Sequence, residues 1–346
     1  MKHLLLTLIV LALMAAGYGV FRNFEQHHRA NNANAPRPML LVYTHSSFMS
    51  PYGPGPEIAE EFSKICLCDV KYIDSGGGQV LFQKLKLAKN VDVVLGLDQA
   101  SLKEAALYIK WRELSAHKRD WHPVFENNKY KTFLPYDWAP VTMVYKKSKE
   151  LAGSESLESL LKSMPDKSLS LPDARQSSLG LQLAYWAFTE AGENLEKFTE
   201  LASLIEKKTY KVSPDWSGSY GIFKRGVSPF VLSYMTSPLY HLKAEKDESY
   251  GAVEVNAGHP VHIEYAAVPD ICRSCGLAKR FVEYLSSDRA QRLIYEKNYM
   301  LPVVNGILSE EEQKLVPEVK PIPAKGLDNF IDQKEEILSR WKLSAN

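Results

Sequence analysis

Apolar runs and amphipathic stretches alternate along the first third of the chain, and their spacing predicts an α/β fold. Strands are expected at 39–43, 69–73 and 92–98, a helix is expected to begin at 57, and 80–88 has helical spacing. Strands that alternate with helices in this way usually form a largely parallel sheet. The sequence therefore predicts an α/β lobe at this end of the protein.

The same alternation continues to the end of the chain. Further strands are expected at 141–145, 169–172, 229–234 and 261–268, and helices at 155–163, 179–207, 277–286, 288–295 and 328–343. Residues 302–323 are rich in Pro and Glu and are expected to form an exposed loop. With 346 residues, the chain is long enough for two lobes, each with its own core.

The amino terminus has the pattern of an export segment. An uncharged apolar run over 4–21 follows Lys2 and His3, which is typical of a signal peptide and is also near the length of a membrane span. A cleaved signal peptide and a retained anchor (1–21) both remain open, and the polar, Asn-rich stretch 22–38 is expected to be a linker. Either alternative predicts that the rest of the protein lies outside the cytoplasm.

The overall charge argues against nucleic acid as a partner. The formal net charge is +1, with 24% charged and 45% hydrophobic residues, whereas nucleic-acid binding normally requires a clear basic excess. Aromatic residues reach 11% and include 18 Tyr, a composition that favours stacking on a ligand.

The four cysteines fall into two close pairs, Cys66 with Cys68 and Cys272 with Cys275. In an oxidising compartment each pair can close locally, or the two pairs can cross-link. A zinc site and a redox role for the second pair stay open, although the first spacing suits zinc poorly. The favoured interpretation is structural disulfides.

Three aromatic residues stand out because small residues and turn formers surround them. Trp216 lies in the segment 213–221, and Tyr234 and Tyr240 lie in the segment 232–241. Flat rings on such stretches are suited to holding a flat, preferably cationic, heteroaromatic ligand. Ordinary core or surface positions are the alternative explanation.

Two stretches are suited to phosphate. The glycine run 76–78, which includes Gly77 and Gly78, stands between a strand and a helix and presents bare N–H groups, although a flexible turn explains it equally well. Ser177 precedes the helix expected from 179, with Arg175 nearby, so a phosphate contact and a simple N-cap are both possible.

Taken together, these stretches resemble the thiamine-binding periplasmic proteins, the substrate-binding components of thiamine ABC transporters, over roughly residues 39–345. The residues that carry the resemblance are Val42-Tyr43-Thr44, Gly53-Pro54-Gly55-Pro56, Cys66-x-Cys68, Asp92–Asp98, Pro135-Tyr136-Asp137, Asp173-Ala174-Arg175, Trp216…Tyr220-Gly221, Leu232-Ser233-Tyr234-x-Thr236-Ser237-Pro238…Tyr240-His241 and Gly258-His259.

The resemblance implies a two-lobed periplasmic binding protein of type II, with the ligand in the cleft between lobes. Lobe 1 is expected to comprise 39–137 plus about 265–346, and lobe 2 to comprise 138–264. The implied ligand is thiamine, thiamine monophosphate or thiamine diphosphate, with no cofactor. The implied partners are a membrane permease and an ATPase; the protein is expected to be a periplasmic monomer and not an enzyme.

The resemblance also assigns ligand contacts. Trp216, Tyr234 and Tyr240 match the residues that wrap the thiamine rings, and Ser177 matches a serine at the phosphate end. Tyr299 and Tyr52 stand where the family usually has Trp.

Elsewhere near the expected ligand site the chain departs from the family pattern. His45 replaces a Tyr, Ser46 replaces an Asp, and the glycine run 76–78 replaces an acidic residue followed by Gly. Asp137 and Asp98 remain as candidate countercharges or amine acceptors, although either can instead cap a hinge or a helix.

Two other functions compete with this one. A ferric-ion-binding protein of the same fold would use His45, Tyr234 and Tyr240 as hard-metal ligands. A thiaminase-like enzyme would need one unpaired cysteine as a nucleophile beside a carboxylate.

Overall fold

The computed structural model describes residues 37–76, 78–114, 119–125, 131–147, 153–323 and 325–345. The expected export segment, the linker as far as residue 36, and Gly77 lie outside these residues. The described strands join in one hydrogen-bonded order, β2-β1-β3-β9-β4-β7-β5-β6, with β8 paired to β4. Their bounds are β1 Met39–Thr44, β2 Asp69–Asp74, β3 Val93–Asp98, β4 Phe133–Lys146, β5 Leu169–Pro172, β6 Thr209–Ser213, β7 Phe230–Tyr234, β8 Tyr250–Ala252 and β9 Val261–Ala267.

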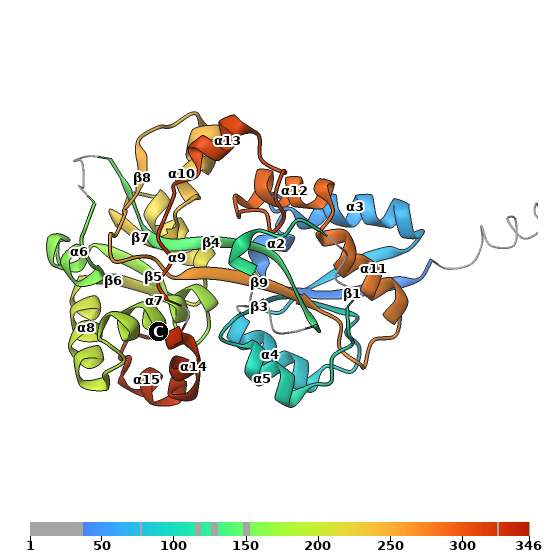
Figure 1. Ribbon diagram of the computed structural model, residues 1–346, viewed down its shortest axis with the longest axis horizontal. Coiled ribbons are helices and arrows are strands. Elements are labelled where there is room, and N and C mark those ends of the chain that lie inside the picture. The colour runs from blue at the N-terminus through green and yellow to red at the C-terminus, as the bar shows by residue number, and fades with distance from the viewer. Residues whose placement is uncertain are drawn as a thin grey trace, which may run out of the picture. The chain divides into compact units, whose positions relative to one another are not determined.

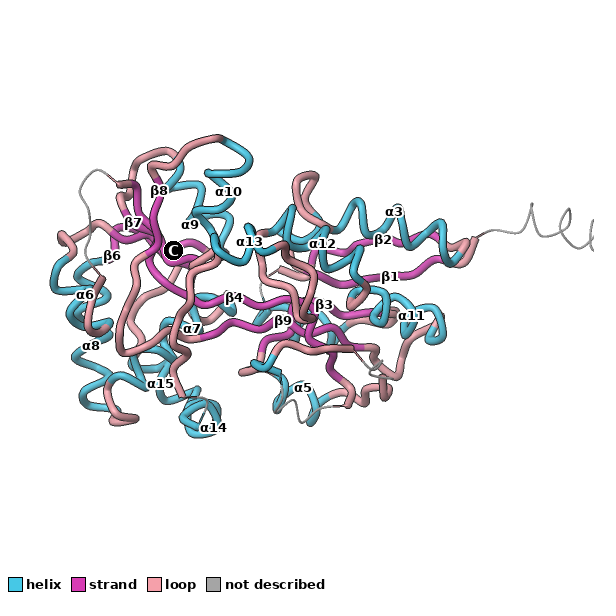
Figure 2. The backbone as a smooth tube through the Cα atoms, turned by 45° about the horizontal axis from the view of Figure 1, so that its top comes forward, coloured by secondary structure: helices cyan, strands magenta, loops and turns pink. Residues whose placement is uncertain are grey.

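Two long antiparallel strands, β4 and β9, connect the two groups of strands. Figure 2 shows them side by side between the two groups of helices. On one side β1 pairs in parallel with β2 and β3, and on the other β5 pairs in parallel with β6 and β7. This arrangement gives two α/β layers, which we call lobe 1 (β1–β3) and lobe 2 (β5–β7), joined by β4 and β9.

Helices cover both faces of the sheet in lobe 1, as Figure 1 shows, with α3, α11 and α12 on one face and α4 and α5 on the other. Gly55 and Pro56 open α3, and its apolar positions Ile58 and Phe62 are buried against the sheet. Helical spacing thus predicts which face of this helix is buried. The helices of this lobe, with the short helices after β1 and before β4, are α2 Ser46–Met49, α3 Gly55–Cys66, α4 Gly78–Leu87, α5 Leu102–Tyr108, η1 Pro123–Phe125, α11 Cys275–Leu285 and α12 Asp288–Asn298.

Lobe 2 has its own apolar core, and the C-terminal helices belong to it. Phe330, Ile337 and Trp341 are fully buried in the cluster that also contains Trp186 and Phe198 of α7 and α8. The sequence-based prediction placed everything after about 265 in lobe 1. That prediction is wrong for α14 and α15, which pack in the core of lobe 2. The remaining helices are α6 Leu157–Ser163, α7 Ser178–Glu190, α8 Leu195–Lys208, α9 Trp216–Lys224, α10 Ser237–Tyr240 with the π-helical turn His241–Glu245, α13 Glu310–Leu315, α14 Lys325–Asp332 and α15 Lys334–Arg340.

Several predicted elements change in detail. The single helix expected over 179–207 is broken because Gly192 and Glu193 have φ of 67° and 60°, in the left-handed region that ends a helix. The helix expected over 328–343 is likewise two helices, and the exposed loop expected over 302–323 contains α13. The strand expected over 141–145 begins earlier, at Phe133.

Both cysteine pairs close locally. Cys66 is bonded to Cys68 at the end of α3, and Cys272 is bonded to Cys275 at the start of α11. The interpretation as disulfides is therefore confirmed, and neither pair provides ligands for zinc. Among the residues that the structure describes, every helix is too short or too polar to span a bilayer.

Candidate functional site

A cavity of about 450 Å³ lies where the two lobes meet β9. This volume is within the usual range for small-molecule sites. Its lining residues come from lobe 1, from lobe 2 and from β9: His45–Ser47, Ser50, Tyr52, Gly53, Gly76, Gly96, Ser177–Leu179, Asp215–Ser217, Tyr220, Lys224, Tyr234, Thr236, Ser237, Tyr240, His262, Glu264 and Lys297–Met300.

Trp216 and Tyr234 both line the cavity from lobe 2. Asp215 caps α9, so Trp216 is the first residue of that helix, and its indole N–H donates to the Ser233 hydroxyl at 2.9 Å. Tyr220, one turn further along α9, has its ring 4.7 Å from that of Trp216. The orientation of the Trp216 ring is therefore fixed by its position at the start of α9 and by this hydrogen bond.

Tyr240 and Tyr299 bring the two lobes together at the cavity. Their ring centroids are 5.9 Å apart in an edge-to-face arrangement. Tyr299 follows α12 with φ of 56°, a conformation that is uncommon for an aromatic residue and that is found more often at functional sites. The Lys224 Nζ lies 4.9 Å from the Tyr240 ring centroid, so a cation already contacts one face of that ring. Tyr52 also lines the cavity, but its side chain is 88% exposed, which places it at the mouth.

His45 and Glu264 form a buried pair at the bottom of the cavity. The His45 Nε2 lies 3.2 Å and 3.3 Å from the two Glu264 carboxylate oxygens, and its Nδ1 lies 2.7 Å from the Ser47 hydroxyl. The Tyr136 hydroxyl donates to Glu264 at 2.8 Å. We call His45, Tyr136, Asp137, His262 and Glu264 the floor cluster.

His45 and Glu264 each stabilise the charged form of the other. Burial alone would lower the pKa of His45, but the Glu264 charge outweighs burial and the pKa is raised above its usual value. Burial alone would raise the pKa of Glu264, but the His45 charge and hydrogen bond lower it to about 2. The pair is therefore charged at moderately acid pH.

The other three members of the floor cluster are Tyr136, Asp137 and His262. Asp137 faces Glu264 in the strand register, and burial together with the Glu264 charge raises the pKa of Asp137 well above its usual range. His262 stacks on Tyr234 at 5.8 Å, and its Nδ1 is 2.9 Å from the Tyr234 hydroxyl. Burial lowers the pKa of His262. Asp98, the other acidic candidate, caps the turn before α5 by accepting from the Ser101 amide at 2.8 Å.

The N-terminus of α7 lies at the cavity. Ser177 has the N-cap position, but its side chain makes no capping hydrogen bond and lines the cavity instead. The Ser178 hydroxyl is buried and has no hydrogen-bond partner in the described part of the chain. Arg175 points elsewhere, because its guanidinium donates to the carbonyls of Leu338, Trp341 and Leu343 in the C-terminal segment. The idea of Arg175 as a phosphate partner is therefore wrong.

The glycines near the cavity have different roles. Gly76 lines it with φ of 75°, whereas Gly78 is the first residue of α4, and Gly77 lies outside the described residues. Gly96 is needed for packing, since a Cβ there would lie 2.6 Å from the His45 ring. Its φ of 89° is also strained for other residues.

Two residues of the cavity floor, His262 and Glu264, were not predicted from the sequence. The stretch 261–268 was predicted only as one more strand, with no role for its polar residues. Side chains two apart in a strand share a face, so the spacing of these two residues was the available signal. The helix α9 was not predicted either, and with it Tyr220 and Lys224 were overlooked as site residues. The available signal was Asp215, which precedes a stretch with helical spacing and so marks a helix start.

The comparisons with known proteins agree on one family, although no family model matches the chain. The thiamine-binding periplasmic protein of Salmonella typhimurium is 36% identical over 318 residues, which is 90% of this chain and 94% of that protein. A solved structure of a periplasmic thiamin binding protein matches with a TM-score of 0.81 at 30% identity, covering 88% of this chain and 96% of that one.

The ferric binding protein from Campylobacter jejuni matches with a TM-score of 0.71 at 17% identity, covering 87% of this chain and 98% of that one. At that identity the likeness shows the fold alone. The type II fold predicted from the sequence is confirmed by these structures. The extent and identity of the matches to the thiamine-binding proteins go further: this chain belongs to the thiamine-binding periplasmic protein family.

Proposed function

We propose that the protein captures thiamine, or one of its phosphate esters, in the cavity between the lobes and delivers it for import. One observation carries the proposal: rings from both lobes and one buried carboxylate surround a single cavity. Thiamine joins a cationic thiazolium to an aminopyrimidine, so it requires both ring faces and a countercharge. The relatives named as thiamine-binding proteins support the same ligand.

The aromatic residues are assigned to the ligand rings. Trp216 and Tyr234 form a wall from lobe 2, and Tyr299 closes from lobe 1 beside Tyr240. Stacking and cation–π contacts of this kind contribute about 0.5–2 kcal/mol each, depending on how far water is excluded. Tyr52 is assigned to the mouth, where it covers the bound ligand.

Glu264 is assigned as the countercharge for the thiazolium. It lines the cavity and is ionised, whereas burial and the Glu264 charge raise the pKa of Asp137 well above its usual range, which makes Asp137 the weaker candidate for a negative charge. His45 lines the cavity beside Glu264 and competes with the ligand for the Glu264 carboxylate.

A phosphate group, where the ligand carries one, is assigned to the N-terminus of α7. Ser177 and Ser178 offer hydroxyls there, and the first amides of the helix favour an anion. Gly76 lines the cavity on the lobe 1 side. Because these groups act together with the rings, the ester and the free vitamin are expected to bind in one orientation.

The setting follows from the family. The protein is expected to be exported to the periplasm, to act as a monomer, and to pass its ligand to a permease and an ATPase of an ABC transporter without chemical change. Its relatives are named as binding proteins, and all four cysteines are in disulfides, so they supply no thiol nucleophile.

Calorimetric titration of the purified protein with thiamine, thiamine monophosphate, thiamine diphosphate and Fe³⁺ tests this proposal. Sub-micromolar affinity for a thiamine species is the expected result, and the order among the three reports on the phosphate end. Binding of Fe³⁺ with no binding of thiamine would reject the proposal in favour of the ferric-ion alternative.

A further inference from the structure

The chain segment that passes from lobe 1 back to lobe 2 carries the short helix α13. The segment starts at Leu301, which bridges Trp138, and ends at Pro321, which bridges His259 before α14 begins in lobe 2. A capping box opens α13: the Glu312 amide donates to the Ser309 hydroxyl at 3.2 Å, and Glu312 accepts from the Ser309 amide at 3.0 Å. The Glu312 side chain therefore has a fixed position on this segment.

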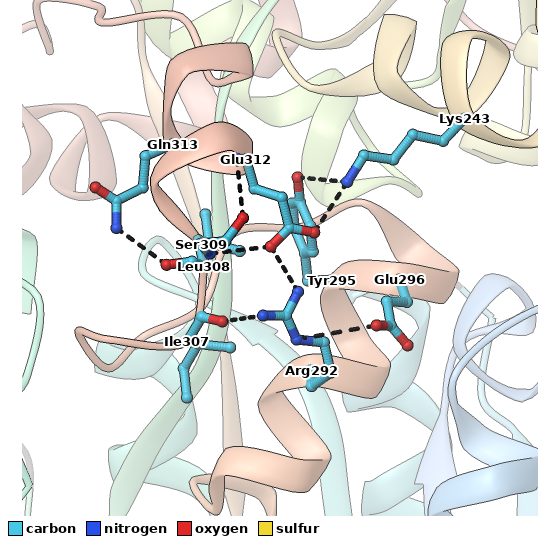
Figure 3. Close-up of polar contacts among 9 residues, drawn as sticks. All are labelled: Lys243, Arg292, Tyr295, Glu296, Ile307, Leu308, Ser309, Glu312 and Gln313. Atoms are coloured by element: carbon cyan, nitrogen blue, oxygen red, sulfur yellow. Dashed lines mark hydrogen bonds and ion pairs between the residues drawn. The ribbon is translucent and has the colours of Figure 1, made fainter.

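Glu312 also joins a cation from each lobe, as Figure 3 shows. Its Oε1 lies 3.0 Å from Lys243 Nζ, in the turn that follows α10, and its Oε2 lies 2.7 Å from Arg292 Nη1 on α12. Arg292 also donates to the Ile307 carbonyl of the same segment. We call Lys243, Arg292 and Glu312 the rim cluster.

The rim cluster is partly shielded from water. The side chains of Lys243, Arg292 and Glu312 are 31%, 28% and 19% exposed. Burial alone would raise the pKa of Glu312, but Arg292, the Ser309 amide and Lys243 lower it to about 2. Glu312 is therefore ionised over the whole physiological range, so its charge is available to both cations whenever the lobes are in this arrangement.

Each cation lies on a segment that carries a tyrosine of the cavity. Lys243 stands three residues after Tyr240, and Arg292 is on α12, which ends at Asn298 just before Tyr299. Lys243 also lies over the Tyr295 ring at 4.7 Å and donates to its hydroxyl at 3.2 Å. Beneath them Leu239, Tyr295 and Leu301 pack in one apolar cluster. The charged contact thus braces the two segments that present Tyr240 and Tyr299 to the cavity.

We infer that Glu312 is a positioning residue for the ligand site, which keeps Tyr240 and Tyr299 together across the cleft and slows release of the bound molecule. The inference rests on the proposed function for its ligand. Glu312 itself does not line the cavity, so it acts only through the two tyrosine-bearing segments. Ligand specificity is therefore expected to be unaffected.

The test compares Glu312→Gln with Glu311→Gln, an exposed neighbour on the same helix. Glutamine at 312 retains one oxygen for the Ser309 amide and is therefore compatible with the capping box, but it removes the charge and replaces the other acceptor oxygen with an N–H donor. Stopped-flow measurement of thiamine dissociation is expected to show release about threefold to tenfold faster in Glu312→Gln, with the association rate and melting temperature little changed. The Glu311→Gln variant is expected to release thiamine at the wild-type rate.

A second variant shows whether the effect passes through the charged contact. Lys243→Met alone is expected to speed release, and combining it with Glu312→Gln is expected to add less than the sum of the two effects. Equal release rates in Glu312→Gln and wild type, or fully additive effects in the double variant, would overturn the inference.

Hydrogen exchange separates this inference from the proposed function, because it needs no ligand. Amides at 240–245 and 298–301 are expected to exchange faster in Glu312→Gln than in wild type or Glu311→Gln. Unchanged exchange there would overturn the inference even if thiamine binds. Faster exchange in a protein that binds no thiamine would support the brace and reject the proposed ligand.

Discussion

The floor cluster and the rim cluster both place a carboxylate between parts of the chain that are far apart in sequence, but they differ in burial. Glu264 and His45 have side chains only 9% and 16% exposed, whereas the three side chains of the rim are 19–31% exposed. A charge interaction in a dry, low-dielectric place is much stronger than one in contact with water and salt.

Their positions differ as well. Glu264 and His45 line the cavity, so a bound cation changes the balance of charges there directly. The rim cluster does not face the ligand and changes only when the lobes move. We therefore expect the floor to determine what binds and with what affinity, and the rim to determine how fast it leaves.

The largest effect is expected when the floor loses its carboxylate. Glu264→Gln is nearly isosteric, but it removes the countercharge from the cavity. Thiamine affinity is expected to fall about a hundredfold, in line with the 1.5–3 kcal/mol typical of hydrogen bonds to charged groups. Calorimetric titration near neutral pH measures this loss of affinity.

Glu254→Gln, at an exposed glutamate shortly before β9, is the control for the loss of one negative charge. Its affinity is expected to stay at the wild-type value. Equal affinity in Glu264→Gln and Glu254→Gln would mean that the thiazolium does not lie near the floor cluster.

The aromatic wall comes next in size. Trp216→Ala and Tyr234→Ala are each expected to weaken thiamine binding at least about tenfold, or about 1.4 kcal/mol, because stacking area is lost. The fold is expected to remain intact by circular dichroism. Tyr210→Ala, at an exposed tyrosine of β6, is the matched control, and wild-type binding by both wall variants would refute the assignment.

These two tests divide the site into a part that the sequence predicted and a part that it missed. The aromatic residues were predictable because Trp216, Tyr234 and Tyr240 stand in turn-rich stretches that resemble the family, and the structure places all three at one cavity. The strands β1 and β3 were also predictable as short apolar runs, and β2 as a short stretch that contains Val, Tyr and Ile.

His45 and Asp137 of the floor were named from the sequence, but the contacts of the floor and the rim were not predicted, because they join residues more than a hundred positions apart or depend on a short helix in an apparent loop. His45 meets Glu264 across 219 residues, and nothing local in either segment indicates the other. The brace at Glu312 needs α13, which the Pro- and Glu-rich composition of its segment concealed. The helices α14 and α15 were placed in the wrong lobe for a similar reason, since apolar spacing shows which face is buried but not against which partner.

The pH dependence of binding tests the floor in a different way. In the ligand-free protein, the pKa of His45 lies above its usual value because of Glu264, with a smaller contribution from Asp74. Below that pKa the protonated imidazole occupies Glu264 and repels the cation, so affinity is full above it and is lost as the pH falls through it. The expected loss is several-fold, and at most about tenfold, per pH unit.

Thiamine itself is the probe here, because its phosphate esters titrate in the same range. The pH profile of His45→Gln is expected to lack the His45 step. Without His45, burial raises the pKa of Glu264, so any loss of affinity that the variant shows on acidification reports protonation of Glu264 instead. Affinity that rises on acidification would show that the ligand presents an anion to His45, and identical profiles for variant and wild type would remove His45 from the binding step.

The smallest expected effect is the response of ligand release to salt, which isolates the rim. Partly exposed ion pairs contribute only about 0.2–1 kcal/mol and weaken with ionic strength, whereas the buried floor pair is screened far less. Raising sodium chloride from about 0.05 M to about 0.5 M is therefore expected to speed thiamine release about twofold in the wild type and to have less effect in Glu312→Gln. Stopped-flow dissociation at matched pH measures both slopes. Equal slopes would mean that the salt-sensitive charges lie elsewhere, and a steeper slope in the variant would show that Glu312 opposes closure of the cleft.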